Sequence, residues 1–114
     1  MAISVKDKVV IVTGGAGEMG SVIARRLVDE GAKVVIADIA DGSALADELS
    51  QRGNAIYVKT DVTSEESTQA MAQAALDVYG RIDAIVNIAG LFTAKPWDEL
   101  SLADWKERFA VNVD

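Results

Sequence analysis

The stretch Val9-Val10-Ile11-Val12-Thr13-Gly14-Gly15-Ala16-Gly17-Glu18-Met19-Gly20 decides the fold of this chain. It begins as an unbroken apolar run typical of a buried strand, turns at glycines, and continues as an amphipathic helix. Glycines allow a sharp turn and let the backbone approach a pyrophosphate without Cβ atoms in the way. The first N–H groups of the following helix carry a partial positive charge. The stretch therefore predicts the phosphate-binding turn of a dinucleotide-binding fold.

Short apolar runs alternate with helical patterns along the chain. We predict four buried strands, at Val9–Thr13, Val34–Asp38, Ala55–Lys59 and Ala84–Asn87. This strict alternation predicts an α/β fold, a Rossmann-like doubly wound parallel sheet with right-handed crossovers and helices on both faces. The 114 residues then form one dinucleotide-binding domain, truncated after the fourth strand and part of the fourth helix, and so incomplete at the C-terminal end.

The first two predicted helices lie between these strands. The first ends before Gly31, and the second runs from near Asp41 to Gly53. On one face the first helix presents four apolar side chains that we expect to be buried: Met19, Val22, Ile23 and Leu27.

The third predicted helix starts at a capping box, Thr63 with Glu66, and ends at Gly80. We expect it to bury Met71, Ala74, Ala75 and Val78. The fourth begins after Ser101, which Asp104 follows three positions later. It places Trp105 and Phe109 together, and we expect both in the core.

Composition excludes several classes of function. The chain has no cysteine and no histidine, which excludes disulfides, Cys/His zinc sites and catalytic sets that need imidazole or thiolate. A metal site made of carboxylates alone stays open, and we assign no metal ligand. The net charge of -7 argues against nucleic-acid and anionic-membrane partners. Lys6-Asp7-Lys8 interrupts the first apolar stretch, so we expect a cytoplasmic protein.

Asp38 strengthens the prediction of a nucleotide site. It closes the second strand 18 residues after Gly20, close to the spacing at which an acidic residue binds the adenosine ribose. A carboxylate accepts bonds from a ribose 2′-hydroxyl and repels a 2′-phosphate. No basic residue occurs from Val34 to Gln51, so we expect NAD in preference to NADP. Asp38 could also be an ordinary turn or helix-capping aspartate.

At this point the sequence resembles the short-chain dehydrogenase/reductase family, in its N-terminal cofactor-binding part. The motifs stand in the family's order: Thr13-Gly14 with Gly20, then Asp38, Asp61-Val62-Thr63, Asn87-Ile88-Ala89-Gly90 and Asn112-Val113. The resemblance implies cofactor contacts at Gly14, Gly17, Glu18, Met19, Gly20, Asp38, Ile39, Asp61, Val62, Asn87, Ala89 and Gly90. It also implies two specific roles: Asp61 would contact the adenine amino group, and Asn112 would support a proton relay to a catalytic lysine.

Three departures from the family pattern affect these expectations. Glu18 stands where shorter family members have glycine, so the turn looks like that of the extended branch, and we expect Glu18 to face outward. Ile88 replaces the second asparagine of the Asn-Asn-Ala-Gly element. Neither Tyr57 nor Tyr79 is followed four residues later by lysine, so the Tyr-x-x-x-Lys pair is missing and we predict no catalysis by this chain alone.

The resemblance implies an NAD-dependent oxidoreductase that transfers hydride between the cofactor and a small alcohol or carbonyl substrate, and that assembles as a homo-oligomer. This chain would supply the cofactor-binding portion. An alternative is a stand-alone, non-catalytic dinucleotide-binding module. A methyltransferase-like fold also places an acidic residue after its second strand, although the Asn-x-Ala-Gly element is unexpected there.

Overall fold

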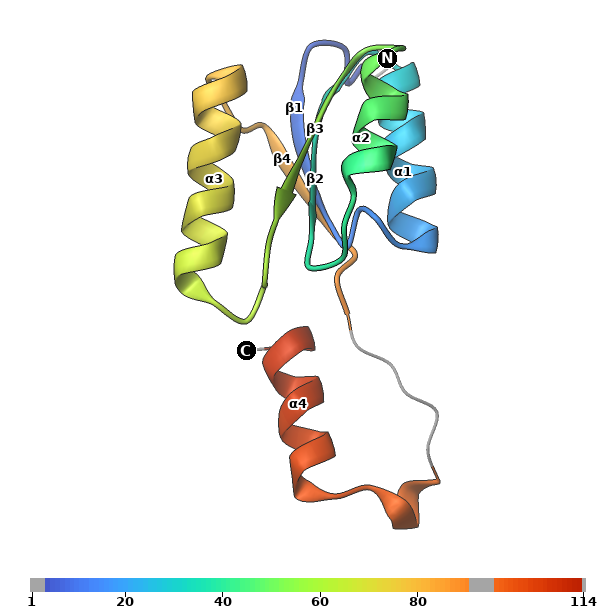
Figure 1. The fold of residues 1–114 in the computed structure, drawn as a ribbon, viewed down its shortest axis with the longest axis vertical. Coiled ribbons are helices and arrows are strands. Elements are labelled where there is room, and N and C mark those ends of the chain that lie inside the picture. The colour runs from blue at the N-terminus through green and yellow to red at the C-terminus, as the bar shows by residue number, and fades with distance from the viewer. Residues whose placement is uncertain (1–3, 91–95, 114) are drawn as a thin grey trace.

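A computed structural model describes residues 4–90 and 96–113 of the chain. Its centre is a parallel sheet of four strands in the order β3-β2-β1-β4 (Figure 1). The strands are β1 (Val9–Thr13), β2 (Lys33–Asp38), β3 (Asn54–Lys59) and β4 (Ala84–Asn87). The predicted doubly wound α/β fold is confirmed, with strand boundaries within one residue of those expected.

Helices cover both faces of the sheet. They are α1 (Glu18–Asp29), α2 (Ser43–Ser50), α3 (Glu65–Tyr79) and α4 (Leu102–Asn112), with a short 3-10 helix η1 (Trp97–Glu99). Helices α1 and α2 lie on one face and α3 on the other, whereas α4 lies beyond the carboxyl ends of the strands (Figure 1). In the described part of the chain, no helix is both long and apolar enough to cross a membrane.

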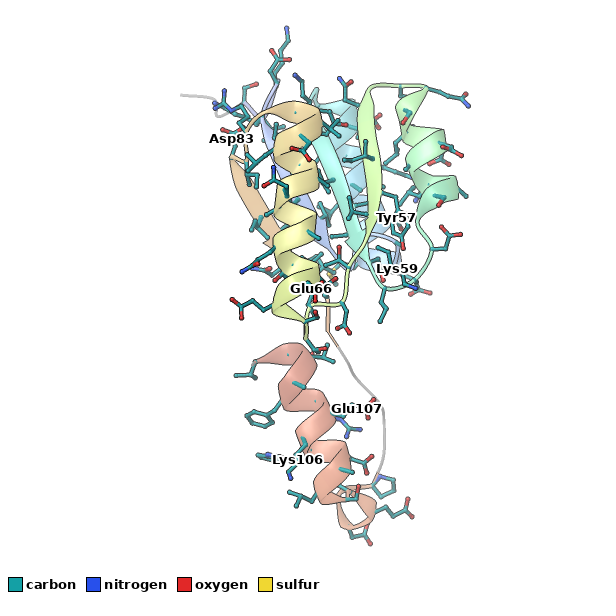
Figure 2. All side chains as sticks on the ribbon, turned by 60° about the vertical axis from the view of Figure 1, so that its left-hand side comes forward. Tyr57, Lys59, Glu66, Asp83, Lys106 and Glu107 are labelled. Atoms are coloured by element: carbon teal, nitrogen blue, oxygen red, sulfur yellow. The ribbon has the colours of Figure 1, made fainter. Side chains whose placement is uncertain are left out.

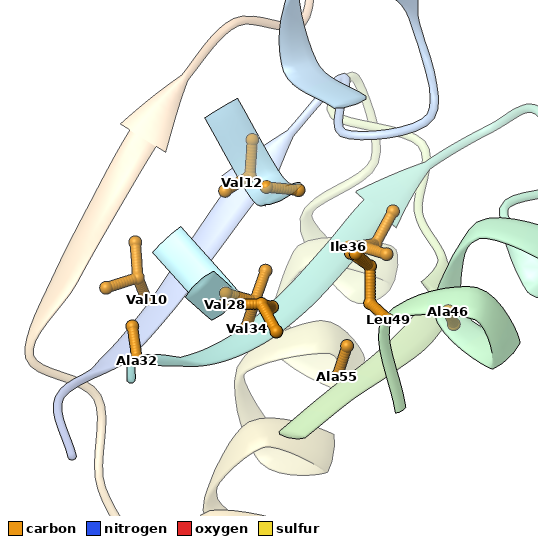
Figure 3. Close-up of a cluster of buried hydrophobic side chains, with 10 residues drawn as sticks. Val10, Val12, Val28, Ala32, Val34, Ile36, Ala46, Leu49 and Ala55 are labelled. Carbon is orange, nitrogen blue, oxygen red and sulfur yellow. The ribbon is translucent and has the colours of Figure 1, made fainter. Parts of the chain in front are cut away.

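Buried side chains from β1 and β2 form the centre of two apolar clusters. Under α1 and α2, Val12 and Ile36 meet Val28 and Leu49 (Figure 3). On the opposite face, Ile11 and its neighbours pack against α3 through Met71 and Ala75. Because successive strand residues point to opposite faces, a strand covered on both sides must be apolar throughout. This explains the unbroken apolar runs in the two central strands.

The prediction of which side chains are buried is wrong in part for two helices, α1 and α3. Met19 and Val22 are 66% and 63% exposed, because α1 turns its small residues towards the sheet, with Gly20 and Ala24 buried. In α3, Met71 and Ala75 are buried as expected, Ala74 is half-buried and Val78 is exposed. Small side chains allow close approach of a helix to a sheet, and hydrophobicity alone ranks them below the larger residues beside them.

Serine side chains cap two of the helices. Ser64, not Thr63, is the N-cap of α3, and its hydroxyl accepts the N–H of Ser67 at 3.1 Å. The fourth helix begins after Ser101 as predicted, and Ser101 forms a capping box with Asp104 at the start of α4. Helix α4 stacks the rings of Trp105 and Phe109 with centroids 4.7 Å apart, as its spacing suggested. The expectation that both lie in the core is wrong, since Trp105 is 59% exposed.

Strand β4 lies at the edge of the sheet, which changes its burial. It pairs with β1 on one side, and Ile85 in its middle is 50% exposed, so the prediction of a fourth buried strand is wrong. The entry to β4 is tied to β1 by Asp83, whose Oδ2 accepts the N–H of Val9 at 2.8 Å. This bond, together with hydrogen bonds from Arg81, lowers the pKa of the Asp83 carboxyl from its usual value.

Candidate functional site

In the segment from Gly14 to Gly20, which joins β1 to the first turn of α1, a Cβ would lie closer than 3.0 Å to another atom at three glycines: Gly14, Gly15 and Gly20. Gly14 has a φ of 68°, and a Cβ on it would lie 2.7 Å from the backbone nitrogen of Ala89. A Cβ on Gly20 would lie 2.1 Å from the Gly14 carbonyl oxygen. The Gly14 N–H donates to the carbonyl of Ala37 at 2.8 Å, which ties the turn to β2. The predicted requirement for glycine at these positions therefore has a steric cause.

The first turn of α1 differs from the starts of α3 and α4. Its N-cap is Gly17, which offers no side-chain hydrogen bond, whereas α3 and α4 have serine caps. Uncapped N–H groups at a helix start, together with the helix dipole, form a site for an anion. Glu18, the first residue of α1, is exposed at this place.

Two carboxylates lie at the carboxyl ends of neighbouring strands: Asp38 is the last residue of β2, and Asp61 lies two residues after the end of β3. Asp38 accepts the N–H of Ala16 at 3.0 Å and that of Ala40 at 2.9 Å. Asp61 accepts both the N–H and the hydroxyl of Thr63, at 2.9 and 2.6 Å, and these bonds lower the pKa of its carboxyl. Asp38 is thereby held by N–H groups of the glycine turn and of the loop after β2, and Asp61 is held by the loop after β3.

The loop after β4 approaches the glycine turn because Thr13 holds it there. The Thr13 hydroxyl accepts the N–H groups of Ile88 and Ala89 at 3.2 and 3.3 Å. Next in the chain is Gly90, where a Cβ would lie 3.2 Å from the Asn112 side-chain oxygen on α4. The end of α4 is therefore brought to the same edge of the sheet.

These elements enclose a cleft of about 310 Å³ at the carboxyl ends of the strands. Eleven of the predicted cofactor residues line it: Gly14, Gly17, Glu18, Met19, Gly20, Asp38, Ile39, Asp61, Val62, Ala89 and Gly90. Asn87 and Asn112 do not line it. Four further residues line the cleft that the sequence patterns did not indicate: Ala37, Thr60, Ile88 and Val111. The first three adjoin predicted residues at strand ends, whereas Val111 depends on where α4 lies.

Neither tyrosine of the chain lines this cleft. The Tyr57 hydroxyl donates to the Asp38 carbonyl at 3.1 Å from the carboxyl-terminal half of β3 (Figure 2). Burial, and then the charges of Asp41 and Asp38, raise the pKa of Tyr57, and burial raises that of Tyr79. Across residues 4–90 and 96–113 no three acidic, histidine or cysteine side chains are grouped to bind a metal. The described residues that line the cleft thus include the glycine turn and three carboxylates, and neither tyrosine is among them.

A glycine turn, an uncapped helix start and an acidic residue after the second strand define a Rossmann-type α/β protein with a nucleotide cleft. The family model described as "short chain dehydrogenase" matches residues 8–114. The chain therefore belongs to the short chain dehydrogenase family, as its motifs suggested, and not to a methyltransferase-like group.

Relatives and solved structures agree with this assignment. An uncharacterized oxidoreductase of Bacillus subtilis, YuxG, is 45% identical over 86% of this chain and 15% of its own length. A hydroxysteroid dehydrogenase from Escherichia coli is similar with a TM-score of 0.89 and 33% identity, covering 96% of this chain and 48% of that protein. A dehydrogenase from Burkholderia cenocepacia with bound NADP has a TM-score of 0.83 and 34% identity, covering 96% and 44%. The chain thus spans less than half the length of each of these three proteins.

Proposed function

We propose that this chain is the NAD-binding portion of an oxidoreductase that transfers hydride between a nicotinamide cofactor and an alcohol or carbonyl substrate. The observation that carries the proposal is the cleft at the carboxyl edge of the sheet, which joins the glycine turn to Asp38 and Asp61. When bound, a nicotinamide cofactor supplies hydride acceptance and donation. The residues of this chain would bind and orient it.

Each part of the cleft suits one part of a dinucleotide. The uncapped start of α1 at Gly17 would take the pyrophosphate, and the glycine turn leaves room for it. Asp38 would accept bonds from the adenosine ribose, and Asp61 with Val62 would lie beside the adenine. The loop at Asn87, Ala89 and Gly90 would follow the cofactor towards its nicotinamide end. Glu18 lines the cleft but is exposed, and its carboxylate would turn to solvent, away from the phosphates.

The preference for NAD over NADP rests on Asp38. Its carboxylate would lie close to the ribose 2′ position, where a 2′-phosphate meets charge repulsion. The Burkholderia cenocepacia protein, in contrast, was solved with bound NADP. Cofactor choice therefore has to be measured on this protein.

Calorimetric titration of the full-length protein with NAD and with NADP tests the proposal. We expect NAD to bind at least about tenfold more tightly. Asp38→Asn should reduce this difference, because it removes the charge and keeps the shape of the side chain. Asp41→Asn is the control, since it removes a charge from the same connection at a side chain bonded to Ser43. Equal affinity of the unmutated protein for both cofactors would contradict an NAD preference.

Catalysis is proposed for the full-length protein and not for these 114 residues. The sequence contains no Tyr-x-x-x-Lys pair, and within it Asn112 is the residue that we assign to a proton relay. The similarity to a hydroxysteroid dehydrogenase supports a small alcohol or carbonyl as substrate. We also propose a cytoplasmic homo-oligomer; the exposed apolar side chains of α4, with Trp105 59% exposed, support assembly.

A further inference from the structure

The carboxylate of Asp38 joins two turns of the protein to each other. Its Oδ2 atom accepts the N–H of Ala16 in the glycine turn at 3.0 Å, and Oδ1 accepts the N–H of Ala40 after β2 at 2.9 Å. Ala16 lies 22 residues before Asp38, so the first of these bonds connects separate elements of the fold. We call this pair of hydrogen bonds the Asp38 clamp.

Asp38 itself is held firmly by the neighbouring strand. Its carbonyl oxygen accepts the Tyr57 hydroxyl at 3.1 Å and the N–H of Thr60 at 2.9 Å. Both donors belong to β3 or to the residue that follows it. The side chain of Asp38 therefore extends from a fixed backbone position and can act as an anchor for the glycine turn.

Ala16 is the residue of the glycine turn that depends on this anchor. Its neighbour Gly15 is confined by packing, since a Cβ there would lie 2.8 Å from the Val12 carbonyl oxygen. The N–H groups of Gly14 and Gly17 donate to backbone carbonyls. For the N–H of Ala16, the acceptor found among the described residues is the Asp38 carboxylate. Loss of that side chain would release the middle of the turn.

We propose that Asp38 is a positioning residue that closes the glycine turn before the cofactor binds, in addition to any contact with the ribose. This inference rests on the proposed function for the identity of the ligand. A carboxylate offers about four acceptor positions, and the clamp uses one on each oxygen. Each oxygen keeps a position for a ribose hydroxyl, so the two roles are compatible. A turn that is already closed costs less to order when the cofactor arrives.

Amide hydrogen exchange of the cofactor-free, full-length protein tests the clamp. In Asp38→Ala we expect the Ala16 amide to exchange at least about tenfold faster than in the unmutated protein, because a charge-assisted bond is lost. Asp41→Ala is the matched control and should leave Ala16 unchanged. The amides of Ile11 and Val35 report whether the sheet remains folded. Unchanged exchange at Ala16 in a folded Asp38→Ala variant would overturn the proposal.

A measurement on the unmutated protein needs no variant to fold. The clamp predicts that the Ala16 amide exchanges at least about tenfold more slowly than in an unstructured peptide. Exchange at the unstructured rate would overturn the clamp.

Inorganic pyrophosphate separates the clamp from a contact with ribose, because it contains no ribose. On charge alone, removing the Asp38 carboxylate should strengthen binding of this anion. Loss of the clamp predicts the opposite, a weakening of about fivefold in Asp38→Ala but not in Asp41→Ala. Tighter binding of pyrophosphate to Asp38→Ala would count against the clamp. If neither pyrophosphate nor NAD binds the unmutated protein, the proposed function fails, while the exchange experiments still decide the clamp.

Discussion

At the scale of single residues, two glycines of one turn have different requirements. A Cβ on Gly20 would lie 2.1 Å from the Gly14 carbonyl oxygen, whereas the atom nearest to a Cβ on Gly17 is 3.4 Å away. We expect Gly20→Ala to lower the free energy of unfolding by about 1–3 kcal/mol, because the turn must move to make room. Gly17→Ala should lower it less, by about 0.5–1 kcal/mol in urea denaturation, because alanine is a poorer N-cap than glycine but a Cβ meets no close atom there.

The same pair of variants separates folding from binding. Gly17→Ala should weaken NAD binding although the variant stays folded, because the added methyl group occupies the uncapped start of α1 where a phosphate would lie. A stable Gly17→Ala variant with unchanged NAD affinity would contradict the assignment of this helix start to the pyrophosphate.

The sequence predicts the residues of the cleft better than their connections. Spacing along a strand-turn-helix unit identified Gly14, Gly20 and Asp38, since each position is set by local chain geometry. The hydrogen bond from Ala16 to Asp38 could not be predicted, because it depends on the rotamer of one side chain and on the exact register of β1 against β2. The placement of Thr13 against Ile88 and Ala89 depends on pairing across 75 residues or more.

At the scale of elements, the start of α3 shows how two adjacent hydroxyls divide their roles. The Ser64 hydroxyl accepts the N–H of Ser67, and the Thr63 hydroxyl donates to Asp61 in the preceding loop at 2.6 Å. We expect Ser64→Ala to lower the free energy of unfolding by about 1 kcal/mol, because a helix N–H loses its acceptor. Thr63→Ala, at an exposed position, should cost less than about 0.5 kcal/mol.

Thermal or urea denaturation of the two variants checks this order. If Thr63→Ala lowered the free energy of unfolding more than Ser64→Ala, Thr63 and not Ser64 would be the N-cap of α3. The sequence pattern favoured Thr63 because Glu66 follows it three positions later, as in a capping box. In the structure Thr63 does not cap the helix, because its hydroxyl and N–H both donate to the Asp61 carboxylate in the turn after β3.

Burial was harder to predict from sequence than secondary structure. Hydrophobic periodicity placed α1 correctly but put Met19 and Val22 on its buried face, where the structure has Gly20 and Ala24. Met19 instead lines the cleft. A large apolar residue beside a cleft is indistinguishable in sequence from one in a core, because both sites favour the same side chains.

At the scale of the whole molecule, alternation of strands and helices was enough to predict the layers, because parallel strands need crossover helices. It was not enough to predict what covers each surface. Strand β4 has the apolar sequence of a buried strand, yet Ile85 is 50% exposed at the edge of the sheet. Helix α4 likewise exposes Leu102 and Trp105. We expect these surfaces to determine whether the 114 residues self-associate in isolation.

A protein comprising only these 114 residues should self-associate through such surfaces. An unpaired strand edge next to apolar side chains is a route to intermolecular pairing, and β4 has β1 on one side only within the described residues. Sedimentation equilibrium should show a mean mass that rises with concentration. Ile85→Lys should lower that mass, because a charge on an edge strand opposes pairing. Ala70→Lys, which adds the same charge at an exposed position of α3, should leave it unchanged.

A clean monomer at every concentration would show that neither β4 nor α4 attracts a second copy. A decrease in mass with Ala70→Lys equal to that with Ile85→Lys would assign the effect to net charge and not to the strand edge.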